Sequence, residues 1–332
     1  MKDVIYDIYP LEDKFLVHTN KDALNFKVME TPLNKTSVEN WKEMIPHRKE
    51  VLITGIDEFK NYIVFKERQN GLTQLSVLDK KTGKKEFLKF DEPAYLIRVP
   101  DNPEYNSDNF RFGYTSLITP YSQYEQNLAT GDRKLLKQQE IIGGYDKNQY
   151  VAERIFATAK DGTKIPMSIV YKKGFEKNGK NPLLLYAYGS YGNSLDASFN
   201  STRLSLLNRG FAFVIAHIRG GQEMGRQWYE DGKMMKKINT FTDFIDCGEF
   251  LVKEKYTSPE HLYAEGGSAG GLLMGAIANL KPELWKGVLS HVPFVDVVNT
   301  MLDESIPLTT NEYDEWGNPN NKEAYFYMKS YS

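Results

Sequence analysis

The six residues from Gly266 to Gly271 read Gly-Gly-Ser-Ala-Gly-Gly and contain the pattern G-x-S-x-G around Ser268. In this pattern the serine occupies a sharp turn between a strand and a helix, and its hydroxyl is exposed above the edge of a sheet. The backbone N–H of Ala269 and the positive end of the helix then face the charge that develops on an attacked carbonyl. The pattern predicts a serine nucleophile for acyl transfer. The alternative is a flexible Gly-Ser loop.

A serine needs a neighbouring base to become a strong nucleophile. In the α/β-hydrolase fold, where this motif is common, an acid and then a histidine follow the serine in chain order. His291 is the one histidine after Ser268, only 23 residues on. It ends the very next predicted strand, whereas the base is expected two strands later. We therefore interpret His291 as structural and expect the chain to be an internal fragment, truncated before the acid and histidine of the triad.

Apolar runs predict the elements that position Ser268. Continuous apolar runs are typical of strands buried on both faces of a parallel sheet. We expect such strands at residues 183–188, 211–216, 262–264 and 287–290. We expect helices that end at Gly210, begin at an Asn239 or Thr240 cap, and cover residues 272–277. After a hairpin over residues 155–171, this alternation predicts an α/β hydrolase with a parallel sheet and flanking helices.

The first part of the chain carries an internal repeat. Similar strand-like segments begin at Lys14, Asn61 and Asn109, at spacings of 47 and 48 residues, and two Thr-Gly turns at Thr82 and Thr130 are 48 residues apart. A period of about 40 to 50 residues is typical of β-propeller blades. We predict a partial β-propeller of about three blades over residues 1–148 and the α/β-hydrolase domain over residues 149–332. A β-sandwich is the alternative.

Composition limits the classes of partner. The chain of 332 residues has a formal net charge of −2, which does not favour nucleic acid, and we interpret the Lys233–Lys237 run as solvated. Cys247 is the one cysteine, so it is expected in the core, and no disulfide can form within the chain. No run of about 18 apolar residues suggests a membrane span. We expect a cytoplasmic protein, with the periplasm left open, and no cofactor or metal.

Several segments resemble the prolyl oligopeptidase family: residues 217–229, 239–244 and 265–271. Residues 293–298 and 315–319 are similar to its oligopeptidase B (protease II) branch. The resemblance extends over essentially the whole chain. It implies a seven-bladed propeller that caps the hydrolase domain and excludes folded proteins. It also implies a serine endopeptidase that cleaves short peptides after Arg or Lys, and an intact enzyme that is a monomer or dimer.

The resemblance assigns roles to individual residues. Tyr188 matches the tyrosine whose hydroxyl joins the Ala269 N–H in the oxyanion hole. Glu312 and Asp314 match an acidic pair that binds the basic side chain before the scissile bond. Two carboxylates two residues apart face one pocket in an extended chain, and a guanidinium prefers carboxylate partners. Without the resemblance, a solvated acidic loop would be the better interpretation.

Two more residues are assigned to substrate binding. Asp196 matches an acidic position in the substrate cleft. A second acid often follows two residues later in the family, but Ser198 stands there in this chain, which weakens the expectation that a second basic residue is recognised. Arg219 is expected either to contact substrate or to pair with a carboxylate and orient a loop.

Other functions stay open at this point. Within the family, the alternatives are a proline-specific member and an exopeptidase. The alternative to an enzyme is a non-catalytic fragment or a binding module. An open propeller leaves unpaired strand edges, which favour association with a partner.

Overall fold

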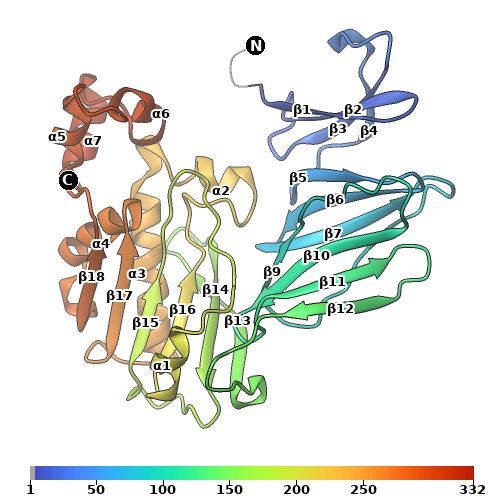
Figure 1. Cartoon of the computed structure of the whole chain (residues 1–332). Coiled ribbons are helices and arrows are strands. Elements are labelled where there is room, and N and C mark those ends of the chain that lie inside the picture. The colour runs from blue at the N-terminus through green and yellow to red at the C-terminus, as the bar shows by residue number, and fades with distance from the viewer. Residues whose placement is uncertain (1–3) are drawn as a thin grey trace. The chain divides into compact units, whose positions relative to one another are not determined.

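The computed structural model describes residues 4–332. The chain forms two compact units (Figure 1). Unit 1 contains the residues up to Glu140 together with Glu223–Gln227, and unit 2 contains Ile141–Gln222 and Trp228–Ser332. The sequence-based boundary between residues 148 and 149 stays a prediction.

Within residues 4–140, unit 1 consists of three four-stranded antiparallel sheets, each with its strands in chain order. The first holds β1 (Tyr6–Pro10), β2 (Lys14–Thr19), β3 (Lys27–Pro32) and β4 (Lys42–Ile45), with the 3₁₀ turn η1 (Val38–Asn40) before β4. The second holds β5 (Val51–Glu58), β6 (Tyr62–Gln69), β7 (Leu72–Asp79) and β8 (Lys85–Phe87). The third holds β9 (Tyr95–Arg98), β10 (Asn109–Ser116), β11 (Ser122–Asn127) and β12 (Arg133–Gln138).

These sheets confirm the prediction of propeller blades. The repeated segments form β2, β6 and β10, the second strand of each sheet, rather than opening each blade as expected. The two Thr-Gly turns connect β7 to β8 and β11 to β12, and Gly83 and Gly131 adopt the positive φ that such turns require. The middle strands of the sheets hold runs of consecutive buried residues, as in β6 and β10, whereas β12 is exposed along its length, and the aromatic side chains Phe110 and Phe112 are fully buried.

Unit 2 is built on a six-stranded sheet among the described residues. Its order is β13 (Tyr150–Thr158), β14 (Lys164–Lys172), β16 (Ala212–Ala216), β15 (Leu183–Tyr186), β17 (Leu262–Gly267) and β18 (Gly287–His291). β13, β14 and β16 pair antiparallel, and β16, β15, β17 and β18 pair parallel. The predicted hairpin and the four predicted strands are therefore confirmed, and so is the α/β-hydrolase class.

Three helices, α1 (Arg203–Asn208), α3 (Ile238–Lys253) and α4 (Ala269–Leu280), make the main helical contacts with this sheet. The other helices are α2 (Arg226–Glu230), α5 (Val297–Leu302), α6 (Tyr313–Trp316) and α7 (Lys322–Lys329), and the 3₁₀ turns are η2 (Lys147–Gln149), η3 (Met234–Lys236), η4 (Pro282–Leu284) and η5 (Thr309–Glu312). The apolar sides of α3 and α4 and alternate residues of the parallel strands share one core, which contains Cys247 as expected. No helix within residues 4–332 is long and apolar enough to cross a membrane.

Two local predictions were wrong at the start of α3. Asn239 and Thr240 lie inside the helix, and Lys237 occupies the N-cap position. The Thr240 hydroxyl donates to the backbone oxygens of Arg219 (2.8 Å) and Gly232 (3.1 Å), so it ties two loops to the helix instead of capping it. Lys237, which we expected to be solvated, is fully buried.

Candidate active site

Ser268 occupies the turn between β17 and α4. Its φ of 56° and ψ of −117° lie in a region that residues with a side chain seldom adopt. The backbone N–H of Ser268 donates to the His291 oxygen at the end of β18 (2.9 Å), and its backbone oxygen accepts from Leu272 in α4 (3.1 Å). The neighbouring strand and the helix thus hold the unusual backbone in place, and the serine is exposed.

Two glycines permit this turn. A Cβ at Gly266 would overlap the carbonyl oxygen of Gly270. A Cβ at Gly270 would come within 2.9 Å of the Ala187 oxygen in the segment after β15. The strand, the turn and the helix therefore approach one another more closely than side chains would allow, which is the physical reason for the glycines around the serine.

The structure brings Tyr188 and Ala269 to Ser268. β15 and β17 are parallel neighbours, so the residues that follow them lie at the same edge of the sheet. Burial raises the pKa of Tyr188 above its usual value. The Tyr188 side chain lies near enough to Ser268 for the serine hydroxyl to lower the pKa of Tyr188 in part, but burial outweighs this, so the Tyr188 hydroxyl keeps its proton at neutral pH. Ala269 is the first residue of α4 and is buried.

The loop after Tyr188, residues 189–192, has three residues at positive φ: Gly189, Tyr191 and Gly192. The backbone N–H of Tyr191 donates to Glu315 Oε1 (2.8 Å), and its hydroxyl donates to Glu312 Oε2 (2.9 Å). Sequence reasoning missed Tyr191 and Glu315. The available signal for Glu315 was its place in an acidic run beside Glu312.

The expected arrangement of the acidic pair was wrong. Glu312 ends η5 and Asp314 lies in α6, so the backbone is helical rather than extended. Residues two apart on a helix point in nearly opposite directions. Glu312 Oε2 accepts from Tyr191 and from Trp316 Nε1 (2.7 Å), while Asp314 is exposed. The two carboxylates therefore do not converge on one pocket through an extended chain.

The imidazole ring of His291 contacts Glu265 and is partly exposed to solvent. Its Nε2 lies 3.2 Å from Glu265 Oε1, and 58% of its side chain is exposed. Its contact with Ser268 is made by its backbone oxygen. This geometry agrees with our interpretation of His291 as structural.

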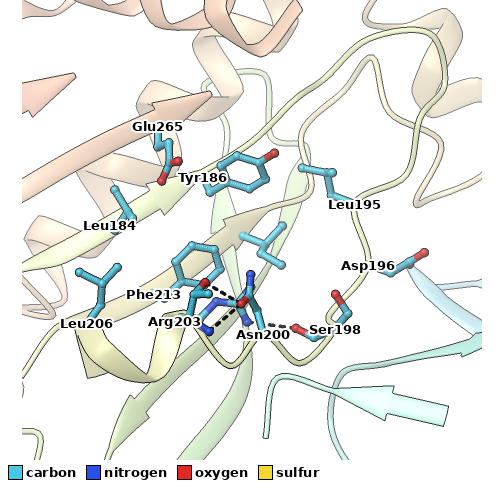
Figure 2. Close-up of a pocket in the computed structure, with 12 residues that line it drawn as sticks. Leu184, Tyr186, Leu195, Asp196, Ser198, Asn200, Arg203, Leu206, Phe213 and Glu265 are labelled. Atoms are coloured by element: carbon cyan, nitrogen blue, oxygen red, sulfur yellow. Dashed lines mark hydrogen bonds between the residues drawn. The ribbon is translucent and has the colours of Figure 1, made fainter. Parts of the chain in front are cut away.

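Asp196 and Ser198 lie beside a pocket of about 460 Å³ on the opposite face of the sheet from the α3–α4 core. Figure 2 shows Glu265 and Asp196 at opposite ends of this pocket. Arg203 lies between them: it donates to the Ser198 oxygen (3.0 Å) and stacks 4.0 Å from the ring centre of Phe213. Burial lowers the pKa of Arg203 to about 10. Asp196 is thus placed in a pocket, but not with Glu312 and Asp314.

Arg219 is held by two carboxylates. Its Nε and Nη2 donate to the two oxygens of Asp243 in α3 (2.8 and 2.5 Å), and its Nη1 donates to Asp161 in the β13–β14 turn (2.6 Å). Burial disfavours its charge, but the hydrogen bonds and attraction of Asp243 and Asp161 outweigh burial and raise its pKa. These ion pairs agree with the second of the two expectations for Arg219, in which it pairs with a carboxylate and orients a loop.

Within residues 4–332, no cluster of three or more His, Cys, Asp or Glu side chains is arranged to hold a metal ion.

Comparison with known proteins gives two matching family models. The model described as "Prolyl oligopeptidase, N-terminal beta-propeller domain" matches residues 2–139. The model described as "Prolyl oligopeptidase family" matches residues 197–332, which include Ser268, Glu312 and Asp314.

Relatives match the whole chain. It is 52% identical to dipeptidyl aminopeptidase BI of Pseudoxanthomonas mexicana, over 100% of this chain and 46% of that protein. It is 46% identical to Protease 2 of Moraxella lacunata, over 99% of this chain and 47% of that protein. Among solved structures, oligopeptidase B from Leishmania major superposes with a TM-score of 0.92 at 42% identity, over 100% of this chain and 48% of that chain. The chain therefore spans about half the length of these relatives.

Proposed function

Because the chain belongs to the prolyl oligopeptidase family, we propose that it carries the nucleophile and oxyanion hole of a serine oligopeptidase that cleaves short peptides after Arg or Lys. The observation that carries this proposal is the strained Ser268 turn with the Tyr188 side chain beside it. Holding a serine at positive φ costs conformational free energy, and residues with such strain cluster at active sites. An exposed serine in this strand–turn–helix context is typical of a nucleophile.

The proposed reaction is acyl transfer. The Ser268 hydroxyl attacks the peptide carbonyl and passes its proton to a general base. The carbonyl oxygen becomes an oxyanion that accepts hydrogen bonds from the Tyr188 hydroxyl and the Ala269 N–H. One such donor contributes about 3 kcal/mol to transition-state stabilisation. The base returns the proton to the leaving amine, and water then hydrolyses the acyl-enzyme.

The proposed general base is a histidine that follows Ser268 in chain order, as the family resemblance implies. His291 is a poor candidate because it ends the strand directly after Ser268, whereas the base is expected two strands later. His217 lies in the core and shares a hydrogen bond of 2.7 Å with Ser168 Oγ. His261 precedes β17, at the opposite end of the strand from Ser268.

Specificity for basic side chains is assigned to Glu312, Asp314 and Asp196. Carboxylates form strong charge-assisted hydrogen bonds with Arg and Lys. Since Glu312 is half-buried beneath Tyr191 and Asp314 is exposed, the two would contact a basic side chain from different positions. Oligopeptidase B and Protease 2 among the relatives support this assignment.

A second candidate function is removal of dipeptides from a free N-terminus. The relative at 52% identity is named dipeptidyl aminopeptidase BI. A blocked peptide separates the two functions, because an endopeptidase accepts it and a dipeptidyl aminopeptidase requires the free amine.

The test compares the wild-type chain with Ser268→Ala. An alkyl fluorophosphonate probe should label Ser268 only slowly, because no base activates its hydroxyl, with the site located by mass spectrometry, and should label nothing in Ser268→Ala. Without a base, hydrolysis of chromogenic peptides should stay near background, because loss of a triad member leaves only about 10³- to 10⁴-fold catalysis over water. Residual hydrolysis should favour N-blocked Arg and Lys peptides over N-blocked Pro peptides.

Other outcomes would contradict parts of the proposal. If prolonged incubation with the probe labels Ser268 no more than background, the chain presents no reactive serine, which favours the non-catalytic alternative. Cleavage confined to dipeptides with a free amine would support the aminopeptidase, and faster cleavage after Pro would overturn the basic specificity. Strong Ser268-dependent turnover would show that a base lies within the chain, and His291→Ala would then be the next variant.

A further inference from the structure

Lys237 is a fully buried lysine between η3 and α3, with 0% of its surface exposed. Its Nζ donates to the Gly189 oxygen and to Ser190 Oγ, both at 2.6 Å. Burying an ammonium group is unfavourable unless its donors are satisfied and its charge is compensated. Both acceptors belong to the residues directly after Tyr188. The lysine therefore donates its hydrogen bonds to the loop that follows the proposed oxyanion donor, Tyr188.

The loop needs to be held. Tyr191 adopts a φ of 59°, which is unfavourable for a residue with a side chain and persists only where the surroundings impose it. Glu315 also contacts this loop, since its Oε1 accepts a hydrogen bond from the Tyr191 backbone N–H at 2.8 Å. The second oxygen of Glu315 accepts from the Tyr229 hydroxyl at 2.5 Å, and only 4% of Glu315 is exposed.

Lys237 and Glu315 also interact electrostatically. Burial lowers the pKa of Lys237 to about 7, and attraction to Glu315 opposes that effect. The Nζ atom lies 4.9 Å from the ring centre of Trp316, the residue after Glu315, at a distance where a cation is attracted to the ring. Lys237 and the 315–316 segment therefore lie near each other, and both contact the loop.

We propose that Lys237 is a positioning residue that, together with Glu315, fixes the 188–192 loop so that the Tyr188 hydroxyl stays at Ser268. Lys237 does not touch the reacting atoms, and it acts through Tyr188. The inference rests on the proposed function, because it assumes that Tyr188 serves Ser268 chemistry.

The first experiment measures the rate at which a fluorophosphonate labels Ser268. Lys237→Met keeps the length of the side chain and removes its donors, and it should slow labelling about tenfold, which corresponds to about 1.4 kcal/mol of transition-state stabilisation. The matched control is Lys236→Met: this neighbouring lysine is solvent-exposed and paired with Asp231 at 2.7 Å. Its labelling rate should stay within about twofold of wild type.

The second experiment asks whether Lys237 acts through Tyr188. In a Tyr188→Phe background, Lys237→Met should slow labelling by less than about twofold, because coupled residues are non-additive. If Lys237→Met slows labelling equally in both backgrounds, Lys237 does not act through Tyr188 and the proposal is overturned.

The third experiment needs no chemistry at Ser268. Hydrogen exchange of the 189–192 amides should accelerate in Lys237→Met, while the β15 amides keep their protection. Should Lys237→Met fail to fold, Ser190→Ala removes one acceptor and should accelerate the same amides. Unchanged exchange in a folded variant would contradict the proposal. Absence of labelling in the wild type would instead contradict the proposed function, and exchange would still test the loop.

Discussion

At the residue scale, the candidate site depends on side chains and backbones that are unusual for their type. Ser268 and Tyr191 have positive φ angles, and the charged side chain of Lys237 is fully buried. Each is unfavourable alone and is stabilised by specific partners: the His291 oxygen for Ser268, and Glu315 for Tyr191. The free energy that holds the site together therefore comes from neighbours that do not take part in the reaction.

Gly266→Ala should damage the turn. The new Cβ would overlap the Gly270 oxygen, which belongs to backbone and cannot rotate away. We expect a loss of about 1–3 kcal/mol in the free energy of unfolding and loss of Ser268 labelling, measured by urea titration and by mass spectrometry. Gly267→Ala is the matched control, since its Cβ would lie 3.5 Å from the nearest atom, in His291. Equal losses in the two variants would show that crowding at Gly266 is not the cause.

Asp161 should give stability that depends on acid pH. A hydrogen bond from the Thr163 backbone N–H and the contact with Arg219 lower its pKa from 3.8 to about 2. A lowered pKa means that the stabilising contribution is complete above about pH 4 and disappears as the pH falls towards 2. Because 49% of the side chain is exposed, we expect less than about 1 kcal/mol.

The measurement for Asp161 is the difference in the free energy of unfolding between the wild type and Asp161→Asn at several pH values. The difference should shrink between pH 4 and pH 2. Other carboxylates titrate in both proteins and cancel. A difference that stays constant down to pH 2 would contradict the prediction.

At the element scale, long regular features were predictable from sequence and short irregular ones were not. The strands of the sheet and the turn at Ser268 follow from apolar runs and from glycines that close packing demands. The helical turn at Glu312–Trp316 was missed because a single turn has too few residues for periodicity, and tertiary hydrogen bonds to Tyr191 stabilise it. Burial of Lys237 was missed because three lysines within residues 233–237 suggest a solvated segment, and residues 234–236 of it are indeed exposed.

The helical turn predicts different roles for its two carboxylates. Glu312→Gln weakens the contact with Tyr191 and should slow fluorophosphonate labelling of Ser268 whatever ligand is present. Asp314→Asn should leave the labelling rate unchanged. It should weaken protection of Ser268 by an N-blocked arginine amide about fivefold, as expected for one exposed charge-assisted hydrogen bond. Identical effects of the two variants would contradict this division of roles.

At the scale of the whole molecule, two compact units are joined by an exposed segment. Ile142 is fully exposed, and Gly143 and Gly144 beside it adopt positive φ with no contacts for a Cβ. Such segments are preferred sites of proteolysis because they can enter a protease without unfolding either unit. The repeat predicted the blades before this segment, and the β-α alternation predicted the sheet after it.

Thermolysin, which cleaves before large apolar residues, should therefore cut first at Ile142. Native proteolysis followed by intact-mass analysis should give one fragment that ends at Ile141 and one that begins at Ile142. Ile142→Gly should slow this first cut without changing the free energy of unfolding by more than about 0.5 kcal/mol. A first cut within β12 would contradict the expected independence of the two units.

The membership of Glu223–Gln227 in unit 1 has a consequence for synthesis on the ribosome. The backbone N–H of Arg226 donates to Asn25 Oδ1 at 2.8 Å, so a loop made early in synthesis gains a contact from a segment made much later. The 87 residues between Glu140 and Gln227 take roughly 4 to 17 s to translate at about 5–20 residues per second. During that interval the nascent blades are exposed without their last contact, and a chaperone has its opportunity to bind them.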